Sequence, residues 1–290
     1  MLTFLSERVE PQTRFFHLGA KAAAMGGAFT GLADGPTGFY WNPAGLAFDR
    51  FSSTGLYVGP IAKLDDSRSS DTQGKGFSVS FPFMGFAFTR LKHDLKQDES
   101  LSSLVTDDFA LTLLQSLPID NLVVAANIHY LRGMFMTEGQ STVSSWAVDV
   151  GVMYEPHERM RWGVTIQKLR EARFQLPDGR GARLRRHIRG GGAIRFSRSF
   201  VVTGDLDLSR QGVVLDEFRE LSMGVEKAWL DERLFVRAGL RTELTSSGVI
   251  KPAPSFGIGI RVLNVDIDTA YRTDGGHREE AFWVNLSLGK

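Results

Sequence analysis

From about residue 50 onward, apolar and polar positions alternate with a period of two in segments of about ten residues. The clearest segment spans residues 200–209, where every second residue from Phe200 to Leu208 is apolar or glycine. A period of two places successive side chains on opposite faces of a strand. Helical periodicity is nearly absent. The pattern therefore predicts an all-β protein whose strands have one apolar and one polar face.

Fourteen candidate strands follow from this pattern. They are predicted near residues 50–59, 75–81, 83–91, 106–117, 119–132, 142–155, 159–170, 186–196, 199–210, 217–230, 233–243, 253–262, 264–273 and 279–289. The connections alternate between tight turns, such as the one at residue 82, and longer loops, such as residues 60–74 and 92–105. An even number of antiparallel strands with short turns at one end and longer loops at the other is typical of outer-membrane barrels.

A soluble β-sandwich or up-and-down barrel also alternates apolar and polar faces. Two features weigh against it. Fourteen strands would enclose an interior too wide for apolar side chains to fill, so the apolar face must point outward. Aromatic residues also gather near the strand ends, as in the girdles of a lipid-facing band. We therefore predict a transmembrane antiparallel β-barrel of about 14 strands.

The polar face of these strands carries charges of both signs in similar number. The positions are Arg161, Arg189, Arg195, Arg237, Arg241, Arg261 and Arg272, with Asp149, Asp205, Asp207, Glu226, Glu243, Asp266 and Asp268. A selective pore usually carries one dominant charge. The mixture favours cross-strand ion pairs that fill and stiffen the interior.

Residues 15–48 (FFHLGAKAAAMGGAFTGLADGPTGFYWNPAGLAF) lack strand alternation and are rich in small residues. Gly26 and Gly27 permit backbone conformations closed to other residues. Asn42 and Pro43, followed by Ala44, favour a turn just before the first strand. Small residues also allow close backbone packing in a confined space. The sequence therefore predicts two parts: an N-terminal segment and lumenal hatch at residues 1–48, and a transmembrane β-barrel at residues 49–290.

This segment also resembles a known family. Its motifs are Gly-Ala-Lys-Ala at 19–22, Met-Gly-Gly-Ala-Phe at 25–29, Ala-Asp at 33–34 and Tyr-Trp-Asn-Pro-Ala-Gly-Leu at 40–46. Together they resemble the N-terminal signature of the FadL-type outer-membrane transporters and the related PorV/PorQ proteins. The resemblance implies a fourteen-stranded barrel with a hatch in its lumen. In FadL-like members the hatch helps to form a hydrophobic path that leaves sideways through the wall, whereas PorV-like members shuttle cargo proteins in type IX secretion.

Two functions from different classes follow. The first is passive uptake of small hydrophobic compounds through a hatch-gated lumen, past the apolar side chains Phe15, Phe16, Leu18, Met25 and Phe29. The alternative is a non-transporting barrel that anchors or shuttles proteins in type IX secretion. An apolar lumen pocket continuous with a wall opening would favour transport, whereas an interior packed with ion pairs would favour the second function. The chain, at 290 residues, is short for a FadL-like transporter, and its short external loops favour the second function, whereas the composition of the hatch favours the first.

Two further features allow two interpretations each. The run Gly190-Gly191-Gly192 is a candidate kink for lateral opening, although glycines there could equally relieve crowding against a hatch. The basic run is predicted to lie in an external loop, where it would bind lipopolysaccharide head groups or simply be solvated. It consists of Arg180, Arg183, Arg185, Arg186 and Arg189.

Composition narrows the function classes. The chain has no Cys, which excludes disulfide scaffolds and thiolate sites, and its 34 basic and 33 acidic residues give no footprint for nucleic acid. The six histidines are scattered, and the adjacent pair His93-Asp94 is expected to be solvated in an external loop. We therefore predict no catalytic or metal-binding residues and no cofactor. Expected partners are outer-membrane lipid and lipopolysaccharide, with a hydrophobic small molecule or secretion-system proteins.

The expected location is the bacterial outer membrane. Residues 1–14 lack the charged start and apolar core of a secretory signal. Since an outer-membrane barrel must be exported, we expect the numbering to begin at a mature or trimmed end.

Overall fold

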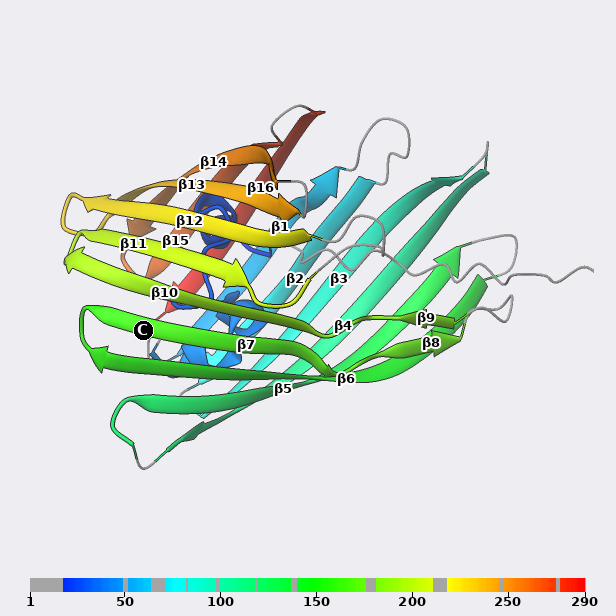
Figure 1. The fold of residues 1–290 in the computed structure, drawn as a ribbon, viewed down its shortest axis with the longest axis horizontal. Helices are drawn as coiled ribbons and strands as arrows, with labels where there is room; N and C mark the ends of the chain where they lie inside the picture. Colours follow the sequence, from blue (N-terminus) through cyan, green and yellow to red (C-terminus); the bar gives the residue numbers. More distant parts are fainter. Residues whose placement is uncertain are drawn as a thin grey trace, which may run out of the picture.

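Fourteen strands close into an antiparallel barrel in the described part of the computed structural model (Figure 1). The structure describes residues 18–48, 52–63, 71–81, 83–97, 100–117, 119–136, 140–175, 181–210, 218–245, 248–274 and 277–289. Each barrel strand pairs with its neighbours in sequence, except that β10 pairs with β7 because the small sheet β8–β9 is inserted between them. The pairing of β1 with β16 closes the ring. The predicted fold class is confirmed.

The element bounds match the predicted segments closely at one end of the barrel. Short turns at residues 158–159, 198–199, 230–233 and 263–264 lie at this end, which we call the short-turn end. We call the opposite end the long-loop end. The small sheet comprises β8 (Arg173–Gln175) and β9 (Gly181–Arg183). The barrel strands are β1 (Ser53–Lys63), β2 (Asp71–Phe81), β3 (Met84–Gln97), β4 (Ser100–Ser116), β5 (Leu122–Met136), β6 (Gln140–His157), β7 (Met160–Arg170), β10 (His187–Ser197), β11 (Phe200–Asp207), β12 (Phe218–Trp229), β13 (Leu234–Thr245), β14 (Gly248–Val262), β15 (Val265–Asp274) and β16 (His277–Gly289).

Several strands reach further toward the long-loop end than the apolar pattern predicted. The expected loop at residues 92–105 is wrong, because β3 and β4 stay paired as far as Gln97 and Ser100. His93 and Asp94 therefore lie in a strand. Residues 171–185, which separate the strands predicted near 159–170 and 186–196, contain the two strands β8 and β9. Backbone pairing continues beyond the apolar band because it does not require apolar side chains, so alternation marks only part of each strand.

The two faces of the barrel differ in polarity. On β1, Leu56 and Val58 are 54% and 60% exposed on the outer face, whereas Tyr57 between them is buried. On β14, Phe256 and Ile258 are likewise exposed and Ser255 is buried. A soluble barrel would have the opposite arrangement, and a lipid-facing barrel requires this one. No helix in the described residues is long and apolar enough to cross a bilayer.

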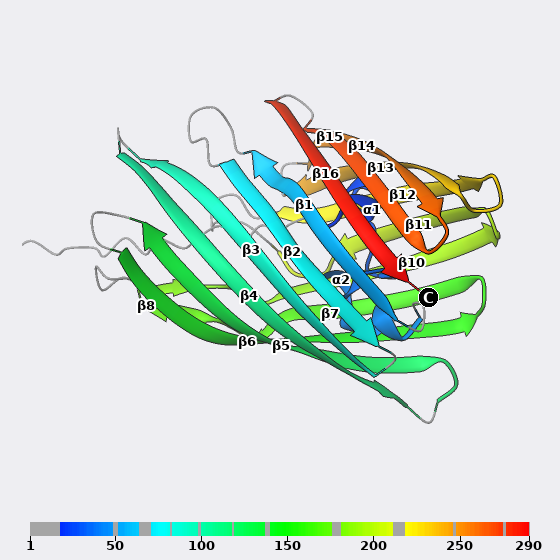
Figure 2. The ribbon, with the colours of Figure 1, turned by 180° about the vertical axis from the view of Figure 1, so that it is seen from behind.

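Residues 18–48, which we call the N-terminal segment, lie inside the ring of strands (Figures 1 and 2). The segment contains α1 (Ala20–Ala24), α2 (Gly38–Trp41) and a 3-10 helix, η1 (Pro43–Phe48). Helix α1 packs against β13 to β16, and η1 packs against β4 to β6. The segment therefore reaches from one wall of the barrel to another.

Candidate functional site

Polar side chains of the barrel wall hold the backbone of the N-terminal segment. Asp205 on β11 accepts hydrogen bonds from the backbone N–H groups of Phe29 and Thr30, at 2.9 and 2.8 Å from its Oδ2. Ser255 on β14 donates to the carbonyl oxygen of Ala24 at 3.0 Å. Asp205 is only 2% exposed, so these hydrogen bonds form away from water. They substitute for the ladder hydrogen bonds that a segment without strand pairing lacks.

The predicted turn at residues 42–44 is hydrogen-bonded both to another part of the N-terminal segment and to the barrel wall. The Asn42 side-chain nitrogen donates to the carbonyl oxygens of Thr30 and Val152, at 3.2 and 3.1 Å. The Ala44 N–H donates back to the Asn42 side-chain oxygen at 3.1 Å, and Pro43 begins η1. One fully buried amide thus connects two turns of the segment with β6.

The two glycines of the motif lie where only glycine fits. Gly26 and Gly27 have φ angles of +69° and +83°, in the left-handed region that favours glycine. A Cβ atom on Gly26 would also lie 2.7 Å from the backbone nitrogen of Leu240 on β13. The segment turns here in direct contact with the wall.

The structure does not bring the predicted ligand-contacting residues together. Leu18 belongs to a buried cluster with Phe39 and Leu46, whereas Phe29 belongs to another and contacts Trp41 edge-on at 6.0 Å between ring centroids. Met25 is fully buried against β12 and β13. Phe15 and Phe16 lie outside the described residues. The three described side chains fill separate contacts between the segment and the wall.

The run Gly190 to Gly192 does not interrupt the barrel ladder. β10 stays in continuous register with both β7 and β11 through these residues. No β-bulge therefore lies at these residues, and close approach to neighbouring atoms accounts for Gly191 and Gly192. A Cβ on Gly31 of the N-terminal segment would lie 2.7 Å from the Gly192 Cα, and a Cβ on Gly192 would lie 2.6 Å from the Trp162 ring.

One of several register shifts in the described ladder lies between β6 and β7. Val148 on β6 pairs with Arg170, yet Val150 pairs with Ile166, so residues 167–169 bulge out of register. Lys168 has a φ angle of +54°, which is unusual for a residue with a side chain. We call residues 167–169 the β7 bulge. The signal for this bulge in the sequence is Lys168, because the alternation along the strand would place its side chain on the outer, apolar face.

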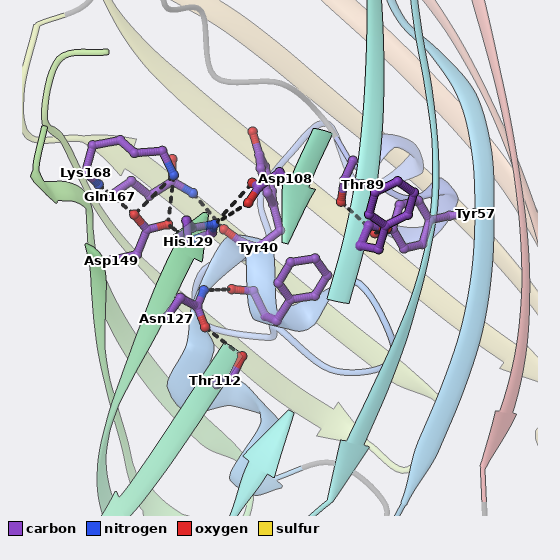
Figure 3. A network of polar contacts seen from close by, with 12 residues as sticks. Tyr40, Tyr57, Thr89, Asp108, Thr112, Asn127, His129, Asp149, Gln167 and Lys168 are labelled. Carbon is purple, nitrogen blue, oxygen red and sulfur yellow. Dashed lines mark hydrogen bonds and ion pairs between the residues drawn. The ribbon is translucent and has the colours of Figure 1, made fainter. Parts of the chain in front are cut away.

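A buried polar network fixes the β7 bulge (Figure 3). His129 on β5, 1% exposed, has its Nδ1 atom 2.8 Å from Asp108 Oδ1 and its Nε2 atom 3.0 Å from Asp149 Oδ2. A neutral imidazole has one N–H, so only the imidazolium ion donates to both carboxylates. Asp149 also accepts from the backbone N–H of Lys168 at 2.7 Å and lies 3.2 Å from the Lys168 Nζ atom. Two carboxylates thus face two cations.

The same region contacts the N-terminal segment. Gln167 in the β7 bulge donates to the carbonyl oxygen of Tyr40 at 2.6 Å (Figure 3). On β5, Asn127 donates to the carbonyl oxygen of Phe39 at 2.8 Å and accepts from the Thr112 hydroxyl at 2.7 Å. Helix α2 is therefore hydrogen-bonded both to the β7 bulge and to β5, which lies two strands away from β7.

Ion pairs occupy much of the remaining interior, as the mixed charges of the polar face predicted. Arg237 on β13 lies 2.6 Å from both Glu226 and Asp268. Glu226 is on the neighbouring strand β12, and Asp268 is on β15, two strands away. Arg189, fully buried, lies 2.8 Å from Glu220 and packs its guanidinium group over the Trp41 ring. The predicted cross-strand ion pairs are confirmed.

Arg189 therefore does not belong to an external basic loop. The alternation along β10 turns it inward, which corrects the prediction of one exposed basic run. Arg186 is exposed and Arg185 is partly buried, while Arg183 lies in β9. Arg180 lies outside the described residues.

Two cavities differ greatly in size. One of about 10 Å³ lies between Leu32 of the N-terminal segment and the short-turn end of β6, β7 and β10. The other, of about 600 Å³, lies at the long-loop end beside the β7 bulge, and we call it the rim groove. It is lined by Ser145, Trp146, Leu169, Arg170, Glu171, Arg173 and Arg186. The described residues contain no group of three or more His, Asp or Glu side chains placed to hold a metal ion.

No protein-family model matches the chain, and no curated protein matches it in sequence. Solved structures match over nearly its whole length. The CymD monoaromatic hydrocarbon channel has a TM-score of 0.68 at 13% identity, with 94% of this chain and 97% of that chain covered. The chain has the FadL-type barrel fold.

Two further neighbours agree with this fold. The toluene transporter TbuX of Ralstonia pickettii has a TM-score of 0.67 at 14% identity, covering 95% of this chain and 99% of its own. A FadL homologue of Pseudomonas aeruginosa has a TM-score of 0.67 at 12% identity, covering 94% and 99%. The names of CymD and TbuX describe a channel and a transporter. At these identities the likeness establishes the fold alone.

Proposed function

We propose that this FadL-type barrel is a channel of the bacterial outer membrane that admits small hydrophobic compounds passively, with the N-terminal segment as its hatch. The observation that carries the proposal is a buried segment inside the barrel that is held to the wall by individual hydrogen bonds and small-residue contacts instead of strand pairing. The FadL-type neighbours described as a hydrocarbon channel and a toluene transporter also support passage of small hydrophobic compounds.

The energies are compatible with a hatch that moves. Each hydrogen bond from wall to segment contributes about 0.5–1.5 kcal/mol net, and more where the acceptor is charged. Burying about 150 Å² of an aromatic compound stabilises its complex by about 4 kcal/mol. A bound compound can therefore offset the loss of two or three such hydrogen bonds. Leu18, Met25 and Phe29, with Phe15 and Phe16, would supply the apolar contacts during passage.

The β7 bulge is the wall position at which we propose the compound leaves sideways. Strand pairing is already interrupted there, and Gln167 connects the bulge to Tyr40 of the N-terminal segment. Movement of α2 would break this hydrogen bond, so displacement of the hatch and loosening of the wall would occur together.

A reversible cross-link tests the proposal. Ala24 and Ala270 lie in one buried cluster between α1 and β15, and the chain has no native cysteine. The double variant Ala24→Cys/Ala270→Cys would bind the segment to the wall when oxidised. The matched control is Ala87→Cys/Ala110→Cys, which joins the directly paired wall strands β3 and β4. Uptake of radiolabelled toluene is measured in cells whose own aromatic channels are deleted.

We expect the oxidised variant to reduce uptake to the level of cells without the protein, and dithiothreitol to restore it. The control should transport at the wild-type rate in both states. Equal uptake by cells with and without the wild-type protein would refute the channel. Undiminished uptake by the oxidised variant, with the disulfide verified, would leave the channel intact and refute the moving hatch.

The packed interior favours one second candidate, a non-transporting barrel of the PorV/PorQ type that anchors or shuttles secreted proteins. Ion pairs such as Arg237 with Glu226 and Asp268 fill space that a wide path would need. This function predicts no protein-dependent toluene uptake. It also predicts that a secreted protein co-purifies with the barrel after mild detergent extraction.

A further inference from the structure

A row of aromatic side chains crosses the outer face of the barrel and ends at the rim groove. Phe77, Phe88, Phe109, Tyr130 and Trp146 are direct cross-strand partners on β2 to β6. Successive ring centroids are 6.0, 4.9, 6.3 and 5.1 Å apart. Trp146, in the long-loop half of β6, is 51% exposed. Tryptophan collects at the level of lipid head groups, so its position indicates that the groove lies near the bilayer surface.

The rim groove forms where the chain leaves the barrel wall. After Arg170, the chain departs from the ladder between β6 and β7. Arg173 then donates its backbone N–H to the Ser145 hydroxyl at 3.0 Å, which holds the start of β8 beside β6. The resulting hollow of about 600 Å³ is open next to exposed, outward-facing Leu169. It therefore adjoins the apolar outer face directly.

The lining carries an excess of positive charge. Arg170, Arg173 and Arg186 are exposed, and within the described residues none of their guanidinium groups forms an ion pair with a carboxylate. The single acid of the lining, Glu171, accepts the backbone N–H of Arg186 at 3.2 Å. Arginine guanidinium groups bind phosphate through paired N–H donors. Three such groups around one hollow are therefore suited to a phosphate.

From these positions we infer that the rim groove binds the phosphate-bearing head group of a membrane lipid, with its acyl chain lying along Trp146 and Leu169. The inference rests on the proposed function only in that the barrel spans a membrane. Free phosphate would use the three arginines alone. A lipid uses both the charged hollow and the adjoining apolar surface, and the groove offers the two together.

Binding is tested on the purified full chain in mild detergent by native mass spectrometry. The probe is dioleoyl phosphatidic acid, compared with dioleoylglycerol, which lacks the phosphate, and with inorganic phosphate as a competitor. The test variant is Arg170→Gln/Arg173→Gln/Arg186→Gln. The control, Arg198→Gln/Arg219→Gln/Arg233→Gln, removes the same charge from exposed positions elsewhere on the barrel.

We expect wild type and control to retain phosphatidic acid at least about tenfold over dioleoylglycerol, and the test variant to lose that preference. Millimolar inorganic phosphate should not displace the lipid. Equal retention by the test variant, or displacement by inorganic phosphate, would overturn the inference. Heat-dependent migration in gel electrophoresis verifies that each variant is folded. The assay involves no transport, so its failure would leave the channel proposal untouched.

Discussion

Asp205 offers a direct measure of how firmly the N-terminal segment is held. Its carboxylate accepts the N–H groups of Phe29 and Thr30 at 2.9 and 2.8 Å. Asp205→Asn keeps the shape and an acceptor oxygen but removes the charge. A charged acceptor strengthens each hydrogen bond by about 1 kcal/mol over a neutral one. The variant should therefore favour displacement of the segment by about 2 kcal/mol, which raises the displaced population about thirtyfold.

Cysteine labelling measures the fraction of molecules in which the N-terminal segment is displaced. Ala28 is fully buried next to the two N–H groups, and no native cysteine competes, so Ala28→Cys reacts with a water-soluble maleimide only when the segment is displaced. When reclosing is faster than labelling, the rate is proportional to the displaced population. The rate for Ala28→Cys/Asp205→Asn is compared with that for Ala28→Cys alone.

The matched control is Asp266→Asn, which removes a carboxylate from the pair with Arg261 in the wall, next to the short turn between β14 and β15. Its labelling rate should stay within about threefold of the parent. If Asp205→Asn also labels at the parental rate, Asp205 does not hold the segment and the reasoning from its hydrogen bonds is refuted.

Two further substitutions test packing and polar contacts in the barrel wall. Gly192→Ala should lower the free energy of unfolding by about 1–3 kcal/mol because its Cβ meets the Trp162 ring, whereas Gly190→Ala, whose nearest neighbour is 3.5 Å away, should be tolerated; urea unfolding in liposomes measures both. His129→Gln should destabilise the barrel by about 3–5 kcal/mol because it leaves Asp108 without its cation and fully buried Asp149 with Lys168 alone, and the same measurement on His157→Gln, exposed at the end of β6, should show little change. A wild-type unfolding curve for His129→Gln would show that the network does not support the β7 bulge.

Local pattern in the sequence determined the number of strands and the polarity of their two faces. Alternation with a period of two depends only on neighbouring residues, so Leu56, Tyr57 and Val58 reveal their faces without knowledge of the fold. Gly26 and Gly27 likewise predicted backbone conformations that other residues rarely adopt, because glycine has no Cβ atom. The pattern ended with the apolar band, which is why the extension of β3 and β4 was missed.

Tertiary structure alone decided which of these residues meet. Phe29 and Asp205 are 176 positions apart, and their hydrogen bond exists because the closed barrel turns β11 toward the segment. His129 lies between Asp108 and Asp149 because three neighbouring strands have one particular register. A register shift of the wall falls at Lys168 and none falls at Gly190 to Gly192 of β10, because register is decided by the pairing between strands. No single strand carries that information in its own sequence.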